Sequence, residues 1–357
     1  MLSLTSTEIN ELARKYDVNV DDVLLIGLNT YGVRSAERYP RARVLLRLEN
    51  RPHETLRMGL PLARDDSPFE ARDGQLFLHD YPVARILELE DDDAVLGYLR
   101  KASRILVLNS NMRSACTGCV FCPNTLEGAS DPKLAVMEEL HAYFCVLEAE
   151  RGWQDLTGLE EVNVVTGCFR EETAAITHLD LVRKVLQRHA FGGTLGFLSS
   201  VILSEGAMTR IASTLSPFLL VVTLECFSRR EVLLKNSKAN LRPEAMPGLL
   251  ASARCAGLET GLTYIVGLEP LELSLEHLLV FQPHLTRFPN FQIFQAHNRF
   301  MGRFAAPGAD RIEFFLDARR RLESAFWKTN LRPQPWVNYR GLWYFTFAGE
   351  ELPGPHS

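Results

Sequence analysis

The chain has 357 residues, of which 46% are hydrophobic and 23% are charged, and this composition excludes a disordered or collagen-like protein. At about 150 residues per domain, the length predicts two domains or one large α/β barrel with an appendage. The formal net charge is −5, and residues 1–100 carry all of it, with 13 Lys and Arg against 18 Asp and Glu. The rest of the chain is balanced, which argues against a broad nucleic-acid-binding face.

Neither a membrane span nor a signal peptide is expected. No apolar run approaches the roughly 18 residues that a span needs. Residues 1–17 lack the basic start and the apolar run of a signal peptide. The seven cysteines are odd in number, and the chain is too long for the disulfide framework of a small secreted domain. We therefore expect a cytoplasmic protein with no membrane partner.

Residues 1–100 are expected to form a small α+β unit. The pattern predicts a helix over Ser6–Tyr16. Extended stretches follow at residues 42–48, 75–78 and 83–89. A charged, Pro-containing loop is expected over residues 62–74. The acidic run at residues 90–93 is predicted to be a solvated helix start, because a short run of like charge is most simply an exposed face.

From residue 104 onward, apolar strand-like runs alternate with helical segments. The runs lie at residues 104–110, 161–167, 194–201, 217–225, 261–267 and 290–295. The helical pattern is clear in the first connection, where apolar residues recur at spacings of three and four at Leu134, Met137, Leu140, Phe144 and Leu147. This alternation predicts a parallel sheet with right-handed crossovers, either an open doubly wound sheet or a partial barrel. The tail, residues 311–357, has a helical stretch and then an aromatic-rich stretch that is predicted to pack across one end of the sheet.

Three cysteines lie close together just after the first of these runs. Cys116, Cys119 and Cys122 have the spacing C-x2-C-x2-C, while the first 115 residues contain no cysteine. Thiolates this close can converge on one metal centre, and soft sulfur ligands suit iron–sulfur clusters or zinc. A structural zinc or a closed electron-transfer cluster takes four protein ligands. Three local thiolates therefore leave one coordination site open for a substrate or cofactor.

Other arrangements of these cysteines stay open. His141 or another distant histidine would complete a Cys3His zinc site. A distant fourth cysteine, for which Cys168 is a candidate, would complete a closed cluster. Chance clustering of structural cysteines is the third alternative, although buried cysteines are usually scattered.

The cysteine loop and the repeats that follow it resemble the radical S-adenosylmethionine (SAM) superfamily. The usual pattern there is C-x3-C-x-aromatic-C, and Cys119-Val120-Phe121-Cys122 matches its second half, including the aromatic residue before the last cysteine. The first gap has two residues instead of three, so the motif is atypical. The similarity covers about residues 100–300, and the turn at residues 261–269 looks more like the biotin-synthase-like branch.

The resemblance implies an α/β fold, a partial (β/α)6 TIM-like barrel with an N-terminal α+β appendage and an aromatic-rich C-terminal extension. The corresponding domains would be residues 1–100, residues 101–305 and residues 306–357. The active site would lie at the carboxyl ends of the strands. Loops and helix N-termini of a parallel α/β sheet converge at that edge on physical grounds as well.

The resemblance also implies two cofactors, a [4Fe–4S] cluster and SAM. Cys116, Cys119 and Cys122 would be the catalytic cysteines that hold the cluster, and SAM would chelate its open iron. One electron, from a reducing flavodoxin or ferredoxin, would cleave SAM to a 5′-deoxyadenosyl radical that abstracts hydrogen from the substrate. The implied cofactor-binding residues are Phe121, Thr166, Gly167, Ser199, Glu225, Arg230, Gly267 and Gln295.

Some of these positions have an expected role in SAM binding. Thr166 and Gly167 stand where the family presents backbone carbonyls to the SAM amino group. Ser199 and Glu225 resemble positions that bind the ribose and amino-acid portions, with a backbone-bonded serine as the other interpretation of Ser199. Arg230 is expected at the SAM carboxylate, because a planar guanidinium suits a carboxylate best. Other cations nearby are Arg229, Lys235 and Lys238.

Polar residues near the last strand and in the tail are the expected substrate contacts. His297, Arg303, Tyr339 and Arg340 are predicted to bind a small-molecule substrate, because such pockets carry a few polar groups on an aromatic-rimmed wall. His297 is a candidate acid or base, with a hydrogen-bonded structural histidine as the other interpretation.

These observations together predict a radical SAM enzyme that acts on a small organic substrate, with natural-product assembly as one candidate role. No cysteine follows Cys255, which indicates a single cluster without auxiliary ones. The alternatives are a radical SAM methylase or a cofactor- or RNA-modifying enzyme, and, from another class, a non-catalytic iron–sulfur or zinc-binding interaction module. Against RNA, the sequence shows no basic strip, so a nucleic-acid partner is not expected.

Overall fold

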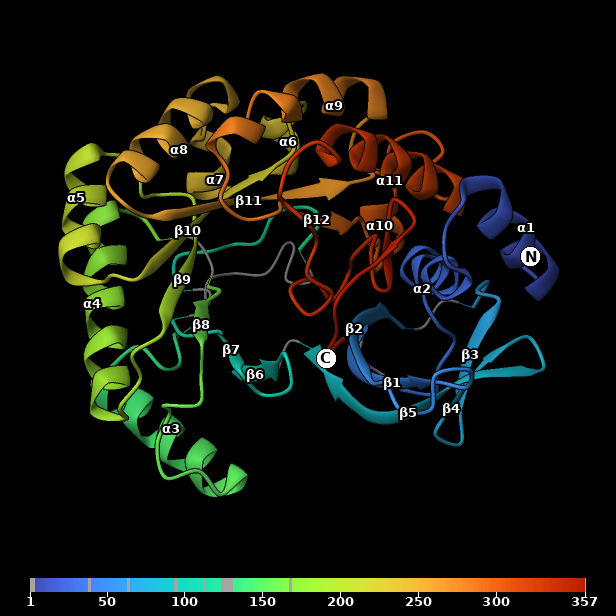
Figure 1. Cartoon of the computed structure of the whole chain (residues 1–357), viewed down its shortest axis with the longest axis horizontal. Helices are drawn as coiled ribbons and strands as arrows, with labels where there is room; N and C mark the ends of the chain where they lie inside the picture. The colour runs from blue at the N-terminus through green and yellow to red at the C-terminus, as the bar shows by residue number, and fades with distance from the viewer. Residues whose placement is uncertain are drawn as a thin grey trace.

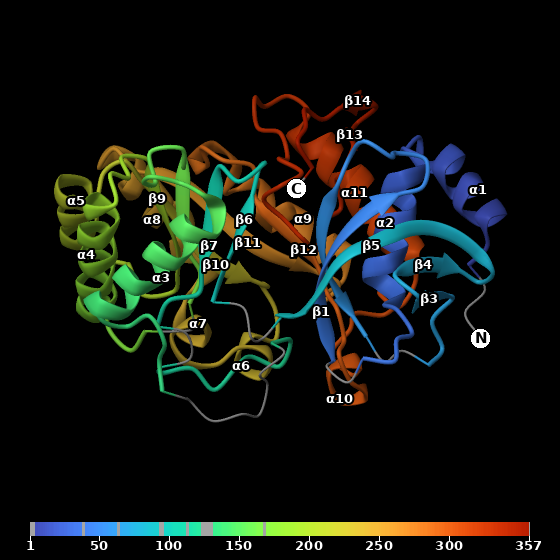
Figure 2. The ribbon, with the colours of Figure 1, turned by 90° about the horizontal axis from the view of Figure 1, so that it is seen from below.

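The structure is a computed structural model of the whole chain, and it describes residues 4–37, 40–62, 65–92, 96–111, 114–122, 131–166 and 169–356. These residues form two main sheets (Figure 1). A large, mostly parallel sheet, covered by helices on its outer side, lies beside a smaller antiparallel sheet. The C-terminal segment, red in both views, runs between the two sheets (Figure 2).

Six strands of the larger sheet come from the apolar runs that were expected to form strands, whereas the strand over residues 97–100 was not expected. Within the described residues the sheet has seven strands in the order β12-β11-β10-β9-β8-β7-β6. Their bounds are β6 Gly97–Arg100, β7 Ile105–Leu108, β8 Glu161–Val164, β9 Thr194–Ser199, β10 Phe218–Glu225, β11 Glu259–Val266 and β12 Asn290–Ile293. From β7 to β12 each strand pairs in parallel with the next, whereas β6 is antiparallel to β7. The sheet is curled (Figure 1), so the fold is a mixed α/β architecture consistent with the predicted partial barrel.

Helices connect the strands on the convex side of this sheet (Figure 1). They are α3 (Met137–Arg151), α4 (Glu172–Arg188), α5 (Glu205–Thr214), α8 (Met246–Cys255) and α9 (Leu271–Leu279), with the short elements α6 (Arg230–Leu233), α7 (Asn236–Asn240), η2 (Pro243–Ala245) and η3 (Gln282–His284). In α3 the side chains of Leu140, Phe144 and Leu147 are buried, as their spacing predicts. Strand residues that face the helices, such as Leu106 and Leu220, are buried as well.

The smaller sheet and two helices make up the N-terminal part of the chain. The elements are α1 (Ser6–Tyr16), α2 (Val20–Tyr31), β1 (Arg41–Leu48), β2 (Leu56–Pro61), β3 (Phe69–Arg72), β4 (Gln75–Leu78) and β5 (Tyr81–Asp91). The strands are antiparallel in the order β2-β1-β5-β4-β3. The predicted helix over Ser6–Tyr16 is confirmed, and a capping box between Thr5 and Glu8 begins it.

Three elements of this part were not expected, namely β2, β3 and α2. β3 lies within residues 62–74, the stretch predicted to be a loop, because its residues pair with β4 across a tight turn at Asp73 and Gly74. Helix α2 is buried on nearly every side, so it lacks the amphipathic period by which a surface helix is recognised.

The prediction of a solvated helix start at residues 90–93 is wrong about the helix at Glu90 and Asp91 and about the exposure of Asp92, although Glu90 is exposed. Glu90 and Asp91 end strand β5. The Asp92 side chain is 1% exposed, and its carboxylate is ion-paired with Arg41 and, at 2.5 Å, with Arg43. A carboxylate with two guanidinium partners can be buried, whereas an unpaired one cannot. Asp93 lies outside the described residues.

The C-terminal segment connects the two sheets. It contains α10 (Arg299–Gly302), α11 (Ile312–Phe326), β13 (Thr346–Phe347) and β14 (Glu350–Glu351). The N–H of Gly59 in β2 donates to the carbonyl of Tyr339 at 3.0 Å, and the N–H of Ile293 in β12 donates to the carbonyl of Arg340 at 2.8 Å. The tail therefore bridges an edge strand of each sheet.

Aromatic side chains pack beside this bridge. Phe288 lies edge-on to Phe326 and Trp343, with ring centroids 5.1 and 5.2 Å apart. The division into residues 1–100, 101–305 and 306–357 stays a prediction, although β6 begins at Gly97 and belongs to the larger sheet. Among the described residues, no helix combines the length and the apolar character that crossing a membrane requires.

Candidate functional site

A cavity of about 460 Å³ lies on the concave side of the larger sheet. Alternate strand residues line it, for example Ile105 and Val107 of β7 and Leu219 and Val221 of β10. Because alternate residues of a strand point to opposite faces, these side chains share the face that the connecting helices leave uncovered. The other walls come from β1, from β6 and from residues 330–343 of the tail.

The cysteine loop forms the part of the wall that follows the carboxyl end of β7. Cys116, Cys119 and Cys122 all line the cavity, together with Phe121. Cys116 and Cys119 are buried and Cys122 is half-buried. Burial raises the pKa of the Cys119 thiol to about 11, against the opposing charge of Lys238. The structure thus brings the three predicted cysteines into one cavity.

Two further predicted residues reach the same wall from the ends of neighbouring strands. Thr166 follows β8 and Glu225 ends β10, and both line the cavity. Glu225 has a left-handed backbone, with φ of 66°, and its Oε1 lies 2.5 Å from Nζ of Lys238, which also lines the cavity. Gly167, predicted beside Thr166, lies outside the described residues, as does Cys168.

Arg230 has a different environment from the one expected for a SAM carboxylate partner. It is buried, and its guanidinium donates to the backbone carbonyls of Leu224, Cys226, Lys238 and Leu241. Burial lowers the pKa of Arg230. These bonds tie the segment after β10 into a fixed shape that includes Lys238.

The remaining predicted positions do not line the cavity within the described part of the chain. Ser199 Oγ accepts from the N–H groups of Val201 and Ile202, which is the backbone-bonded arrangement. Gln295 Nε2 donates to Asn29 Oδ1 and to the Gly59 carbonyl, both at 2.8 Å. The other members of this group are Gly267, His297 and Arg303.

Gly267 and Arg303 can be placed more closely. Gly267 has a φ of 108°, and a Cβ there would lie 3.1 Å from Phe294 and 3.2 Å from Phe315, so the position is packed against α11. Arg303 follows α10 and is exposed. Of the predicted substrate contacts, Tyr339 and Arg340 do line the cavity.

A cluster of arginines and tyrosines from β1, β6 and the tail forms another part of the cavity wall. Most of these residues were not predicted from the sequence. Arg41 and Arg43 come from β1, and Tyr98 and Arg100 come from β6. The Arg43 guanidinium carbon lies 3.3 Å from the Tyr98 ring centroid, and that of Arg100 lies 4.8 Å from it. Burial would raise the pKa of Tyr98, but the charges of Arg100 and Arg43 outweigh it and lower the pKa. The available signal was the alternation of Arg41 and Arg43 with apolar residues at the start of β1, a strand that also contains Arg47.

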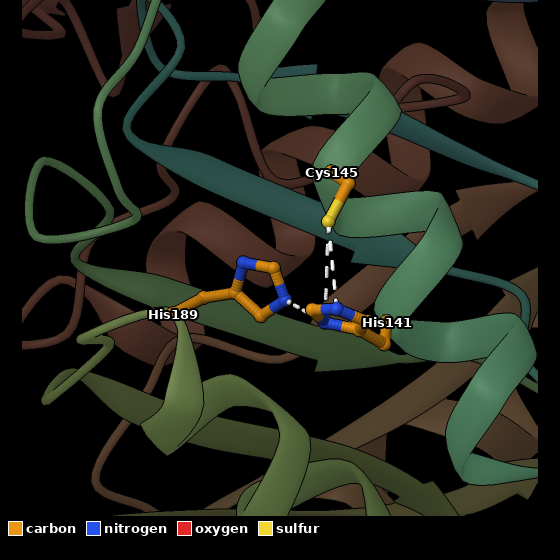
Figure 3. Close-up of side chains that lie close together, drawn as sticks. All are labelled: His141, Cys145 and His189. Carbon is orange, nitrogen blue, oxygen red and sulfur yellow. Dashed lines mark hydrogen bonds between the residues drawn. The ribbon is translucent and has the colours of Figure 1, made fainter.

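A second cluster lies on the outer helices and not in the cavity. His141 and Cys145 of α3 and His189, at the end of α4, place one possible ligand atom each within 4.8 Å of one another (Figure 3). His141 Nδ1 is 2.9 Å from His189 Nε2. The structure therefore pairs His141 with His189 and gives it no place in the wall that the three loop cysteines line.

No protein-family model and no curated protein matches the chain. Among solved structures it is similar to Streptococcus suis SuiB bound to S-adenosylmethionine, with a TM-score of 0.43 and 13% identity over 64% of this chain and 48% of that one. It is also similar to TsrM, a radical S-adenosylmethionine methyltransferase from Kitasatospora setae with cobalamin and a [4Fe–4S] cluster bound, with a TM-score of 0.35 and 16% identity over 55% of this chain and 37% of that one. For anSMEcpe with bound AdoMet, the TM-score is 0.40 and the identity 10%, over 62% of this chain and 58% of that one. The matches thus span between 37% and 58% of those proteins.

Proposed function

We propose that this chain is a radical SAM enzyme that holds a [4Fe–4S] cluster on Cys116, Cys119 and Cys122 and binds SAM beside it. The observation that carries the proposal is that three thiols of one loop line a cavity at the carboxyl ends of parallel strands. When bound, the cluster and SAM supply the 5′-deoxyadenosyl radical that abstracts a hydrogen atom from the substrate. The biotin-synthase-like branch and a single cluster per chain are parts of this proposal.

The donors around the loop fit a cluster held by thiolates. The Gly118 N–H lies 3.4 Å from Cys116 Sγ, and the Lys235 N–H lies 3.3 Å from Cys119 Sγ. N–H groups directed at sulfur stabilise its negative charge and tune the reduction potential of an iron–sulfur cluster. The charge of Lys238 acts in the same direction on Cys119. Three thiolate ligands leave one iron of a [4Fe–4S] cluster without a protein ligand, so SAM can bind there.

Glu225 and Lys238 are the residues proposed to hold the amino-acid part of SAM. They line the cavity as an ion pair with 2.5 Å between Oε1 and Nζ. Such a pair offers an acceptor to an ammonium or hydroxyl group and a cation to a carboxylate. Arg230 acts here as a positioning residue, because its Nη2 donates to the Lys238 carbonyl at 2.7 Å. Thr166 and Gly167 stay proposed for the SAM amino group.

The substrate is proposed to be a small organic molecule. The cavity volume of about 460 Å³ falls in the range of small-ligand pockets. Tyr339 and Arg340 are its proposed contacts from the tail. A reducing flavodoxin or ferredoxin is the proposed electron donor.

The proposal is tested by anaerobic reconstitution with iron and sulfide, followed by EPR of the reduced protein with and without SAM. We expect about four irons per chain, as one [4Fe–4S] cluster requires, and a signal that changes when SAM is added. Cys119→Ser should lose the iron, because a buried thiolate ligand is removed. Cys255→Ser is the matched control, since Cys255 is exposed at the end of α8 and does not line the cavity.

Either of two results would contradict the proposal. One is a single bound zinc with no cluster, and the other is a cluster whose signal is indifferent to SAM. Both would favour a non-catalytic metal-binding module.

A further inference from the structure

The geometry points to a binding site for an anionic group, a carboxylate or a phosphate, at the arginines of β1, β6 and the tail. As a statement about the substrate it rests on the proposed function, because the substrate would occupy the same cavity. As a statement about a binding site it rests only on the side chains described here.

The first argument is the balance of charge in the cavity wall. Among the described lining residues, seven side chains are cationic and three are carboxylates. Glu161 is paired with Arg287 at 3.3 Å, and Glu225 with Lys238 at 2.5 Å. The third carboxylate is that of Asp92. In the described part of the wall, Asp92 is therefore the carboxylate that remains to balance the four arginines Arg41, Arg43, Arg100 and Arg340.

The second argument is that the cluster is buried and that several of its donor atoms lack an acceptor among the described residues. The Arg43 side chain is 3% exposed, and its Nη2 donates to Asp92 at 2.5 Å. Its Nε and Nη1 are buried and, apart from the contact of the Arg43 side chain with Tyr98, have no hydrogen-bond partner in the described part of the chain, and Nε of Arg340 is likewise buried without one. Buried donors without an acceptor are costly. An anion in the cavity would supply the acceptors.

The third argument is the effect of the cluster on its own tyrosines. Burial alone would raise the pKa of Tyr98 and of Tyr339. The charges of Arg100 and Arg43 nevertheless lower the pKa of Tyr98, and those of Arg340 and Arg41 lower the pKa of Tyr339. The same arginine charges would attract an anion in the cavity while the two tyrosines are protonated.

The fourth argument concerns shape. Arg100 is fixed by a bond from Nη1 to the Trp336 carbonyl at 3.1 Å and from Nη2 to the Tyr98 hydroxyl at 2.7 Å. Arg43 is stacked on the Tyr98 ring. Guanidinium groups held in place in this way suit the planar, bidentate recognition of carboxylate or phosphate.

The test uses the full chain without iron, sulfide or SAM. Thermal unfolding is measured against inorganic phosphate and against succinate, with KCl added so that the ionic strength is constant. We expect Tm to rise and saturate with at least one of the two anions. In Arg43→Gln the anion concentration for half of the rise should increase by about tenfold or more, as loss of a charge-assisted bond implies.

Arg85→Gln is the matched control, because Arg85 belongs to the same small sheet but has a side chain that is 63% exposed. If Arg43→Gln fails to fold, Arg340→Gln, which is half-buried in the tail, takes its place. A response to phosphate alone assigns a phosphoryl group, and one to succinate alone assigns a carboxylate. No response in the wild-type chain, or the same response in Arg43→Gln, overturns the inference. A chain that binds the anion but never cleaves SAM keeps this inference and loses the proposed function.

A different observation carries a second inference, a divalent-metal site on the outer helices. We propose that His141, Cys145 and His189 bind a zinc-like cation, with water as the remaining ligand. His141 and Cys145 are four residues apart on α3 and therefore share one face of the helix (Figure 3). Imidazole and thiolate are the ligands that zinc prefers.

The orientation of His189 supports this site. Its Nδ1 lies 2.7 Å from Glu148 Oε1, so Nδ1 is the protonated nitrogen and Nε2 faces His141 at 2.9 Å. A carboxylate that holds the far nitrogen of a histidine in this way is the common support of a metal ligand.

Titration with Co²⁺ at neutral pH tests the site in a Cys116→Ser, Cys119→Ser, Cys122→Ser variant, which removes the competing thiols. We expect about one Co²⁺ per chain, because the chain has one such set of ligands. We also expect a sulfur-to-cobalt charge-transfer band. Cys145→Ser should abolish the band, and Glu148→Gln should weaken binding by about 10–100-fold. Cys255→Ser is the control and should change neither. Absence of the band, or its persistence in Cys145→Ser, overturns the proposal.

Discussion

Nη1 of Arg319 lies 3.1 Å from Oδ2 of Asp22, and the two side chains are 1% and 0% exposed. The pair joins α11 of the C-terminal segment to α2 of the N-terminal part. Asp22 also accepts from the backbone N–H groups of Tyr344 and Thr346, at 2.7 and 3.0 Å. The two ends of the sequence are therefore built around one buried carboxylate.

Removal of the cation from this pair should be strongly destabilising. Arg319→Ala leaves the Asp22 charge buried without its guanidinium, and we expect the free energy of unfolding to fall by about 3–5 kcal/mol. Arg320→Ala is the control, because Arg320 is 58% exposed and pairs with Asp317 at the surface. Its effect should be below about 1 kcal/mol. Urea unfolding measures both, and equal effects would contradict the role given to the buried pair.

The contribution of Glu225 to SAM binding can be measured directly. If its carboxylate holds the amino-acid part of SAM, Glu225→Gln should weaken binding to the reconstituted protein by roughly tenfold, the loss of one charge-assisted interaction. Glu244→Gln is the control, since Glu244 is exposed in η2. Calorimetric titration with SAM gives both affinities. An affinity in Glu225→Gln that equals the control would remove Glu225 from the site.

The position of Tyr339 depends on the absence of a side chain at Gly59. A Cβ at residue 59 would lie 2.7 Å from Cδ2 of Tyr339, which is too close for the ring to stay in place. We expect Gly59→Ala to lower the free energy of unfolding by about 1–3 kcal/mol through this overpacking. Gly206→Ala in α5 has open space around its Cβ and should be stabilising, by about 0.4–1 kcal/mol. Two variants that shift stability in the same direction would argue against this packing.

His178 should make the stability of the chain sensitive to mild acid. Its Nε2 is hydrogen-bonded to Ser110 Oγ at 2.7 Å in a buried position, and burial lowers its pKa to about 4. The unfolded value is about 6.5, so below it the unfolded chain binds the proton first and the folded state loses stability. From pH 7 to pH 5 the loss from this group should be about 2 kcal/mol.

The comparison of wild type with His178→Gln isolates this effect. Urea unfolding at pH 7 and pH 5 should show a smaller pH dependence in His178→Gln than in the wild type. His53→Gln, at an exposed position, should retain the wild-type dependence. If all three chains lose the same free energy, burial of His178 is not the cause.

Features that depend on neighbours a few residues apart could be predicted from the amino-acid sequence. The capping box of Thr5 and Glu8 begins α1, and the spacing of Leu140, Phe144 and Leu147 gives α3 a buried face. The alternation of apolar runs with helical segments after residue 104 predicted the parallel strands of the larger sheet. Such patterns act through local backbone geometry, so they can be recognised without knowledge of the fold.

Which polar side chains face the cavity depends on the packing of the two sheets and the tail, and the sequence does not show it. The alternation of Arg41 and Arg43 in β1 has the same sequence pattern whether the arginines face solvent or a cavity. Asp92 lies in an acidic run that is typical of a surface, and only the fold brings Arg41 and Arg43 to its carboxylate. Arg230 was the better chemical choice for a carboxylate, but the fold directs its donors to backbone carbonyls and leaves Lys238 in the wall. These outcomes depend on contacts between residues far apart in the chain, and burial then sets the charge that each group can carry.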